Sequence, residues 1–398
     1  MDLSGLHVLE PGTPEEGVEE SSTGFYIEYG YRPDVVGRAP GRVNLMGEHT
    51  DYNNGVTLPL ALPHATYAAI AARDDNVVRI TSSAVEGTWS GTLEGIGPGR
   101  VSGWAAYAAG VLWSMREEGI ELPGVDIYVD SSVPWGAGLS SSAALEAAVA
   151  AGMWAIAGRD PQELDRSMLV DVCVRAESQI AGAPTGGMDQ CAAFLTTPGE
   201  ALYIDFKEFK CYDIDLQLEA AGAELLVVDS AVRHSLTHGS YGDRRRECER
   251  AAKALGVETL READLAAVDA LPDPLLRRRA RHVVTEIARV EQVVTAFDNA
   301  DARAVGELFT ASHASLRDDF EISCTEVDVI VERLLSAGAL GARLTGGGFG
   351  GSVVAILPSH RTGMACLAVE AAFRTTGWLP PRFLKLTPSE AAQVVFTA

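Results

Sequence analysis

A strand that leads through a glycine-serine loop into a helix is the feature that most constrains this sequence. Residues 125–133, VDIYVDSSV, are short and apolar enough to predict a strand, and they run directly into PWGAGLSSSAALE at residues 134–146. Apolar residues then recur at intervals of three to four, which predicts a helix that the serines cap and that ends at Gly158. The recurring residues are Leu145, Val149, Met153 and Ile156.

The start of this helix has the physical properties of an anion-binding site. Unpaired backbone N–H groups and the positive end of the macrodipole lie at a helix N-terminus. Gly136 and Gly138 let the backbone approach phosphate oxygens closely, and Ser140, Ser141 and Ser142 add hydroxyl donors or a metal ligand. The alternative is an ordinary glycine loop before a serine-capped helix. The spacing does not match G-x-x-x-x-G-K-[ST], so this loop is not a P-loop.

A second segment, GRVNLMGEHTDYNNG at residues 41–55, crowds polar side chains into a short span. Arg42, Glu48, His49 and Asp51 place one cation, two carboxylates and an imidazole within it. The simplest interpretation is a solvated loop whose charges face water, and these residues alone do not show whether the loop instead binds a ligand.

A third segment, LTGGGFGGSVVAIL at residues 344–357, has five glycines among the six positions from 346 to 351. It lies between two predicted strands. A tight hairpin is the alternative, but a turn needs one or two glycines rather than five. The lack of side chains therefore predicts that another group approaches this backbone closely.

A fourth segment, RAESQIAGAPTGGMDQCAAF at residues 175–194, places Asp189 among glycine and apolar neighbours, with Glu177 on a predicted helix twelve residues earlier. A carboxylate in such surroundings is a candidate for desolvation and catalysis. Taken alone, Asp189 is equally compatible with a helix cap.

Composition limits the class of protein. The 398 residues exceed the usual size of one hydrophobic core, so two domains are expected, and 47% hydrophobic residues suffice to build them. The net charge of -23 opposes binding to nucleic acid or to an anionic membrane. The arginine runs 244–246 and 277–279 have glutamates close by, which predicts solvated helix faces. The six cysteines form no C-x-x-C pair, which fits a reducing cytoplasm.

Mixed strands and helices predict an α+β fold. Residues 1–20 are acidic and lack a secretory signal, and we expect them to form a mobile lead-in. Residues 21–206 then form a first domain and residues 207–398 a second, because after residue 206 the composition shifts to helices such as 282–297. The most apolar stretch, residues 143–158, is too short to span a bilayer.

The four segments resemble, in order, the galactokinase branch of the GHMP kinases. GRVNLMGEHTDYNNG is similar to the galactokinase signature, PWGAGLSSSAALE to the family's ATP motif and RLTGGGFGGSVV to its third motif. VRHSLTHGSYGDRRRECE, from Val232, is a further match, and the resemblance covers roughly residues 36–357. It implies a two-domain GHMP fold with the active site in the cleft between the domains. It also implies ATP-dependent phosphorylation of the anomeric hydroxyl of α-D-galactose, the first committed step of galactose use.

The resemblance also implies roles for individual residues. Asp189 would take the proton of the sugar hydroxyl or orient that hydroxyl, with Arg42 favouring its ionised form. Magnesium would lie near Ser142 and Glu177. The residues expected to hold galactose are Arg42, Glu48, His49, Asp51, Gly186, Asp189 and Tyr241. Those expected to hold ATP are Ser82 and Trp104 near the base, Gly136, Ala137, Gly138, Leu139, Ser140, Ser141 and Ser142 at the phosphates, and Gly346 and Gly347 of the third motif.

Two other functions stay open at this stage. A sensor that binds galactose and ATP without turnover would share the motifs, although silent relatives can lack the intact GLSSSAAL run. A kinase for N-acetylgalactosamine or arabinose would differ only in the shape of its pocket. A mevalonate-type substrate carries a carboxylate and would need a cation to bind it. The carboxylates of Glu48 and Asp51 would instead repel that group. The motifs depart from other members at Met46, Trp135, Thr185 and Gly187, which concerns fine specificity. The oligomeric state is undetermined, and a monomer is compatible with the sequence.

Overall fold

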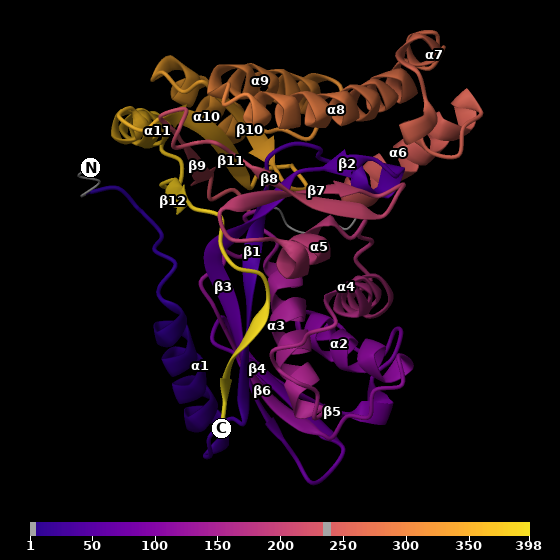
Figure 1. Cartoon of the computed structure of the whole chain (residues 1–398), viewed down its shortest axis with the longest axis vertical. Coiled ribbons are helices and arrows are strands. Elements are labelled where there is room, and N and C mark those ends of the chain that lie inside the picture. Colours follow the sequence, from indigo (N-terminus) through magenta and orange to yellow (C-terminus); the bar gives the residue numbers. More distant parts are fainter. Residues whose placement is uncertain (1–4, 234–239) are drawn as a thin grey trace.

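The computed structural model describes residues 5–233 and 240–398, so part of the VRHSLTHG stretch lies outside the described residues. Its strands form sheets of six, four and three strands (Figure 1). Helices pack against the two larger sheets, and the three-stranded sheet lies between these sheets. This mixture of sheets and helices confirms the predicted α+β class.

The six-stranded sheet has the order β13-β1-β3-β6-β4-β5, with only β4 and β6 parallel. α1 packs against β3 and β6 on one face, and α3 packs against β1 and β3 on the other (Figure 1). The strands are β1 (Val35–Asn44), β3 (Pro59–Ala72), β4 (Val77–Ser82), β5 (Val85–Thr92), β6 (Val125–Ser131) and β13 (Gln393–Thr397). The helices of this part are α1 (Pro14–Tyr29), α2 (Ala105–Glu117), α3 (Ser141–Ile156), α4 (Arg166–Arg175) and α5 (Met188–Leu195).

The four-stranded sheet is antiparallel in the order β10-β11-β9-β12, and α9 and α10 pack against β10 and β11. Its strands are β9 (Ala223–Asp229), β10 (Gly341–Thr345), β11 (Ser352–Pro358) and β12 (Arg382–Leu386). The third sheet contains β2 (Val56–Thr57), β7 (Glu200–Asp205) and β8 (Lys210–Asp215). The remaining helices are α6 (Ser240–Leu255), α7 (Leu265–Asp269), α8 (Pro274–Asp298), α9 (Ala302–Asp318), α10 (Thr325–Ser336) and α11 (Thr362–Thr376).

The first twenty residues differ from the prediction of a mobile lead-in. α1 already begins at Pro14, and the Thr13 hydroxyl accepts a hydrogen bond from the Glu16 N–H at 3.2 Å while the Glu16 carboxylate accepts one from the Thr13 N–H at 2.8 Å. This reciprocal cap stabilises the helix start, and acidic residues in a first turn complement the macrodipole. The acidic composition therefore belongs to a capped helix, and the prediction is wrong for residues 14–20.

Segments near both ends of the chain connect the two larger sheets. Val8 forms a parallel bridge with Phe383 of β12, and the Leu9 N–H donates to the Phe383 carbonyl at 2.9 Å. The last strand, β13, pairs with β1 of the first sheet, with Val36 opposite Phe396. The C-terminal end of the predicted second domain thus completes the sheet of the first. The boundary near residue 206 stays a prediction.

The predicted secondary-structure elements are confirmed, but two side chains lie in surroundings that differ from the prediction. The strands predicted from Val77 and Val125 are β4 and β6, and the helix expected after the glycine-serine loop is α3. Ser140, however, does not cap α3, because its backbone is left-handed with φ of 59° and its hydroxyl donates to Asp189. Arg279 does not lie on a solvated face: it is 2% exposed and pairs with Glu247 at 2.7 Å.

Candidate active site

Arg42 and Asp189 form a two-pronged ion pair where three of the predicted motifs meet. Arg42 lies in β1, and its Nε and Nη2 donate to Oδ1 and Oδ2 of Asp189 at 2.7 and 2.9 Å. Arg42 Nη1 donates to the Gly138 carbonyl at 2.6 Å, and the Ser140 hydroxyl donates to Asp189. The Asp189 side chain keeps 23% of its surface exposed, whereas that of Arg42 keeps 6%. Hydrogen bonds from Arg42 and Ser140 therefore fix the Asp189 carboxylate, which remains accessible to a small molecule.

Asp51 lies beside this pair, at the start of the single turn Asp51–Asn53. A Cβ atom added to Gly186 would overlap the Asp51 carboxylate, which explains why a glycine stands there. Burial raises the pKa of Asp51 to about 6, the hydrogen bond from the Tyr52 backbone lowers it, and the neighbouring Asp189 raises it. The two carboxylates thus lie near each other and differ in their surroundings.

Glu48 is joined to the third glycine motif. Its Oε1 accepts from the Gly346 N–H at 3.0 Å and lies 3.1 Å from the Thr345 hydroxyl, and its Oε2 accepts from Arg343. With 1% of its surface exposed, Glu48 is the most enclosed of the residues predicted to hold the sugar through a side chain.

His49 lies in an aromatic cluster. Its Nδ1 is 2.8 Å from the Tyr52 hydroxyl and its Nε2 is 3.3 Å from the Gly347 carbonyl. The ring centroid of Tyr241 lies 5.0 Å from that of His49, so Tyr241 belongs to the same cluster. Burial, together with the nearby His282, lowers the pKa of His49 to about 3, so the imidazole is neutral at neutral pH.

The two glycine-rich loops contact each other. β10 and β11 pair antiparallel, so the third motif is a hairpin loop, and its glycines also allow a close approach. Gly346 has φ of +86°, and a Cβ atom there would lie 2.5 Å from the Gly138 carbonyl oxygen. The Ser352 hydroxyl donates to the Ala137 carbonyl at 2.8 Å. The predicted close approach to this backbone is therefore made by the predicted ATP loop itself.

Glu177 and Ser142 are hydrogen-bonded to each other, and Asp189 is close enough to affect Glu177 electrostatically. Burial and the neighbouring Asp189 raise the pKa of Glu177 to about 7, even though hydrogen bonds from Gln190 and the Ser142 hydroxyl favour its charged form. A hydroxyl and a carboxylate side by side are hard oxygen ligands of the kind magnesium prefers. Within residues 5–233 and 240–398, no group of three or more His, Cys, Asp or Glu could hold a metal. Magnesium here would need further oxygens from another molecule, such as the phosphates of a nucleotide.

Two residues of this arrangement were missed by the sequence analysis. Gln190 Nε2 donates to Glu177 at 2.6 Å and to Glu146 at 3.1 Å, and Glu146 is fully buried in α3. A carboxylate in the middle of an otherwise apolar helix was the available signal for Glu146. Gln190 had no signal beyond its place next to Asp189.

The residues predicted near the nucleotide base are less closely tied to this centre. Trp104 immediately precedes α2, and burial together with Glu177 and Glu146 raises the pKa of Tyr107, one turn further on, to about 12. The start of α2 therefore lies beside Glu177. Ser82 ends β4, and its hydroxyl accepts a hydrogen bond from the Ala84 N–H at 3.2 Å.

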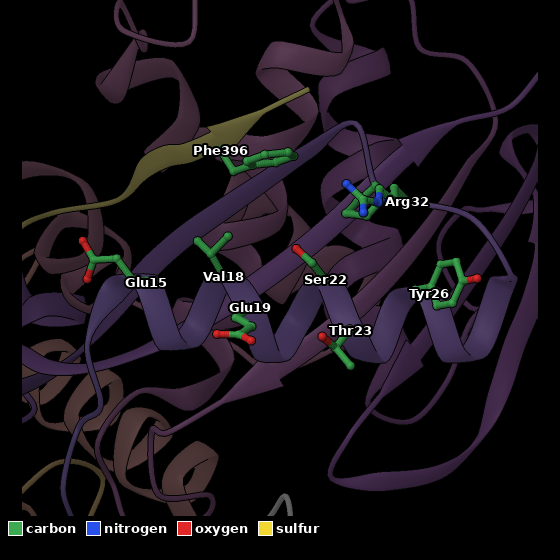
Figure 2. A pocket seen from close by; sticks show the side chains of 9 residues that line it. Glu15, Val18, Glu19, Ser22, Thr23, Tyr26, Arg32 and Phe396 are labelled. Atoms are coloured by element: carbon green, nitrogen blue, oxygen red, sulfur yellow. The ribbon is translucent and has the colours of Figure 1, made fainter.

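A surface groove of about 580 Å³ lies elsewhere, between α1 and β13 (Figure 2). One face of α1 and the ring of Phe396 form its sides, and none of the residues predicted to act on a substrate lines it. The lining residues are Glu15, Val18, Glu19, Ser22, Thr23, Tyr26, Arg32, Pro33 and Phe396. In the described part of the chain, no helix combines the length and the apolar character needed to cross a membrane.

Three family models match the chain. The galactokinase galactose-binding signature matches residues 23–72, the GHMP kinase N-terminal domain residues 106–197 and the GHMP kinase C-terminal domain residues 293–365. A galactokinase of Streptomyces coelicolor is 45% identical over 374 residues, which cover 92% of this chain and 95% of the relative. The chain belongs to the galactokinase family. A galactokinase of Canis lupus familiaris is 39% identical, covering 92% of this chain and 94% of its own.

Solved structures agree with this galactokinase assignment. A galactokinase of Lactococcus lactis in complex with galactose superposes with a TM-score of 0.88 at 27% identity, covering 94% of this chain and 99% of its own. A mevalonate kinase of Methanococcus jannaschii, at 17% identity and a TM-score of 0.64, covers 90% and 99% and shares the fold alone. The predicted GHMP fold of two domains is confirmed.

Proposed function

We propose that this chain transfers the γ-phosphoryl group of ATP to the anomeric hydroxyl of α-D-galactose, which yields galactose 1-phosphate and ADP. The Arg42–Asp189 pair is the observation that carries the proposal. It joins the galactokinase signature to the ATP motif through the Gly138 carbonyl and the Ser140 hydroxyl, and it leaves Asp189 partly exposed. A nucleophilic hydroxyl at Asp189 would thus lie next to the loop proposed for the phosphates.

The sugar is proposed to bind between the galactokinase signature at residues 41–55 and the start of α5. Asp51 and Asp189 are hydrogen-bond acceptors for its hydroxyls, and Gly186 leaves room for the carboxylate of Asp51. The further residues proposed to hold galactose are Arg42, Glu48, His49 and Tyr241. Their mixture of donors and acceptors suits a polyol better than an apolar or anionic substrate.

The phosphates of ATP are proposed to bind at residues 136–142 and at Gly346 and Gly347, with Trp104 and Ser82 nearer the base. The N-terminus of α3 supplies unpaired N–H groups and the positive end of a macrodipole. Ser142 and Glu177 are proposed to hold Mg²⁺, which would neutralise charge on the phosphates. Phosphoryl transfer needs mainly positioning and charge neutralisation, and these groups supply both.

Asp189 is proposed to accept the proton of the anomeric hydroxyl through one of its carboxylate oxygens as that hydroxyl attacks the γ-phosphorus. Arg42 fixes the orientation of the carboxylate by its two parallel hydrogen bonds. We further propose that the enzyme acts in the cytoplasm and binds neither nucleic acid nor membranes, on the strength of its charge of -23 and its scattered cysteines.

The proposal is tested by ADP release from the purified protein with ATP and Mg²⁺. The sugars are galactose, 2-deoxygalactose, N-acetylgalactosamine, glucose and arabinose, with mevalonate as a non-sugar substrate. We expect the fastest turnover on galactose. Faster turnover on another compound would reassign the substrate, and galactose binding without any turnover would identify a sensor.

A further inference from the structure

Arg343 is a buried cation directly in front of the third glycine motif. It lies in β10, and its side chain has no exposed surface. Its Nε donates to the Ser312 hydroxyl at 3.1 Å, and its Nη1 donates to the carbonyls of Asn44 and Leu45 at 3.2 and 2.8 Å. Its Nη2 donates to the carboxylate of Glu48. One guanidinium thus connects β10 and α9 to the segment of residues 41–55 proposed to bind the sugar, through two of its backbone carbonyls and the Glu48 side chain.

The carboxylate of Glu48 is held from the β10 side. Arg343 binds Oε2, while the Gly346 N–H at 3.0 Å and the Thr345 hydroxyl at 3.1 Å contact Oε1. The contacting groups come from three of the four consecutive residues 343–346. Glu48 therefore has one defined orientation, and the orientation is set by a strand almost 300 residues further along the chain.

A second carboxylate completes the cluster. Glu286 of α8 accepts from the Gly47 N–H at 3.2 Å, from Arg343 at 3.3 Å and from Arg289 at 2.8 Å. Burial opposes ionisation of Glu286, but Arg289 and Arg343 lower its pKa to about 2. Arg343 and the carboxyl groups of Glu48 and Glu286 are thus buried together beside residues 41–55, with the partly exposed Arg289 next to Glu286. Buried ion pairs are costly to desolvate and add little stability over an apolar core, so a requirement for orientation explains them better than stability does.

We infer that Arg343 is a positioning residue for the sugar site, which acts by orienting the Glu48 carboxylate toward one hydroxyl of the substrate. The inference rests on the proposed function. Arg343 itself is fully buried, so it would act on the substrate through Glu48 and not by direct contact. Lysine cannot replace it, because an ammonium group lacks the planar fork that contacts Glu48, Ser312 and two carbonyls at once.

The experiment compares galactose with its 2-, 3-, 4- and 6-deoxy derivatives by calorimetry. Glu48→Gln first identifies the hydroxyl that Glu48 binds, as the one whose removal no longer costs affinity in the variant. Arg343→Lys should then weaken galactose binding by about 5- to 150-fold. It should leave the affinity for the deoxy sugar that lacks this one hydroxyl nearly unchanged.

Arg279→Lys is the matched control. Arg279 is also buried, at 2% exposure, and contacts Glu247, Glu321 and the Asp319 carbonyl, but none of residues 44–48. It should lower the thermal midpoint without changing the deoxy-sugar profile. If Arg343→Lys weakens all five sugars by the same factor, or weakens none, Arg343 is only structural and the inference is overturned.

Two further outcomes are separable. A parent protein that does not bind galactose would overturn the proposed function and, with it, this inference. A parent that binds galactose while Arg343→Lys keeps the parental profile would overturn the inference alone. Should Arg343→Lys not fold, Ser312→Ala removes the acceptor of Arg343 Nε and leaves Glu48 intact. It should then show a smaller loss at the same hydroxyl, and an unchanged profile would count against the inference.

Discussion

Arg42 donates two parallel hydrogen bonds of 2.7 and 2.9 Å to Asp189, although the two residues lie 147 positions apart in the chain. The third nitrogen of the same guanidinium donates to the Gly138 carbonyl. The position of the proposed base is therefore tied directly to the proposed phosphate loop. Changes at either residue are expected to affect catalysis more than binding, because both act where the hydroxyl meets the phosphate.

Asp189→Asn should separate chemistry from shape, because asparagine keeps the size of the side chain and cannot accept the proton. If Asp189 is the base, kcat should fall by roughly 10²- to 10⁴-fold while the KM for galactose changes little. Steady-state kinetics with saturating ATP and Mg²⁺ would measure both constants.

The controls for Asp189 are folding and the neighbouring cation. The thermal midpoint of Asp189→Asn should match that of the parent in excess ATP and Mg²⁺. Arg42→Lys keeps the charge but loses the two-pronged contact, so it should cause a smaller yet clear loss. If folded Asp189→Asn kept kcat within about tenfold of the parent, catalysis would rest on positioning and Mg²⁺ alone.

Asp51→Asn should stabilise the protein at pH 8 and weaken its galactose binding. The pKa of Asp51 rises from 3.8 in the unfolded chain to about 6 in the folded one. As the pH rises from 4 to 6, the unfolded chain loses this proton first, so stability falls and stays lower above pH 6. The difference corresponds to about 3 kcal/mol at most, a cost that asparagine avoids.

Urea unfolding of both proteins at pH 5 and pH 8 without galactose would test this. The gain of the variant over the parent should be larger at pH 8. An equal difference at both values would mean that Asp51 does not titrate as described. Calorimetry at pH 8 should show galactose affinity reduced by about 5-fold or more, because the substrate hydroxyls lose a charged acceptor.

Glu177→Gln should raise the Mg²⁺ concentration needed for half-maximal rate, because it removes the charged oxygen ligand beside Ser142. Glu146→Gln is the matched control, since Glu146 is also buried and also bonded to Gln190 but lies in the interior of α3. Its Mg²⁺ titration should stay close to that of the parent. An unchanged titration in Glu177→Gln would place the metal elsewhere.

Gly346→Ala should destabilise the protein, because its φ of +86° disfavours a side chain and the new Cβ atom would press on the Gly138 carbonyl at 2.5 Å. Gly347→Ala is the control, because it adds a methyl group to the same loop. Its Cβ atom would meet only Tyr241, at the ordinary contact distance of 3.6 Å. We expect a drop of several degrees in the thermal midpoint for the first variant and a small change for the second. Equal midpoints would argue against contact between the two glycine loops.

The sequence by itself determined most of what is local. The strand at Val125 and the helix α3 follow from residue types and spacing, because local propensity acts over a few neighbouring residues. The five glycines from 346 to 351 likewise indicated a backbone that another group approaches closely. The order of the four segments also identified the family. The cap at Thr13 is equally local, and it shows that an acidic composition does not by itself predict a mobile segment.

Only the tertiary structure decided which of these residues meet. Ser140 turns from its expected cap to Asp189, Gln190 joins Glu177 to Glu146, and β13 returns to the first sheet. Arg343 contacts Glu48 although the two residues lie 295 positions apart in the chain. Such contacts leave no periodic trace in the sequence, because they depend on how the separate elements pack. The orientation of each carboxylate in the site is therefore a property of the assembled fold.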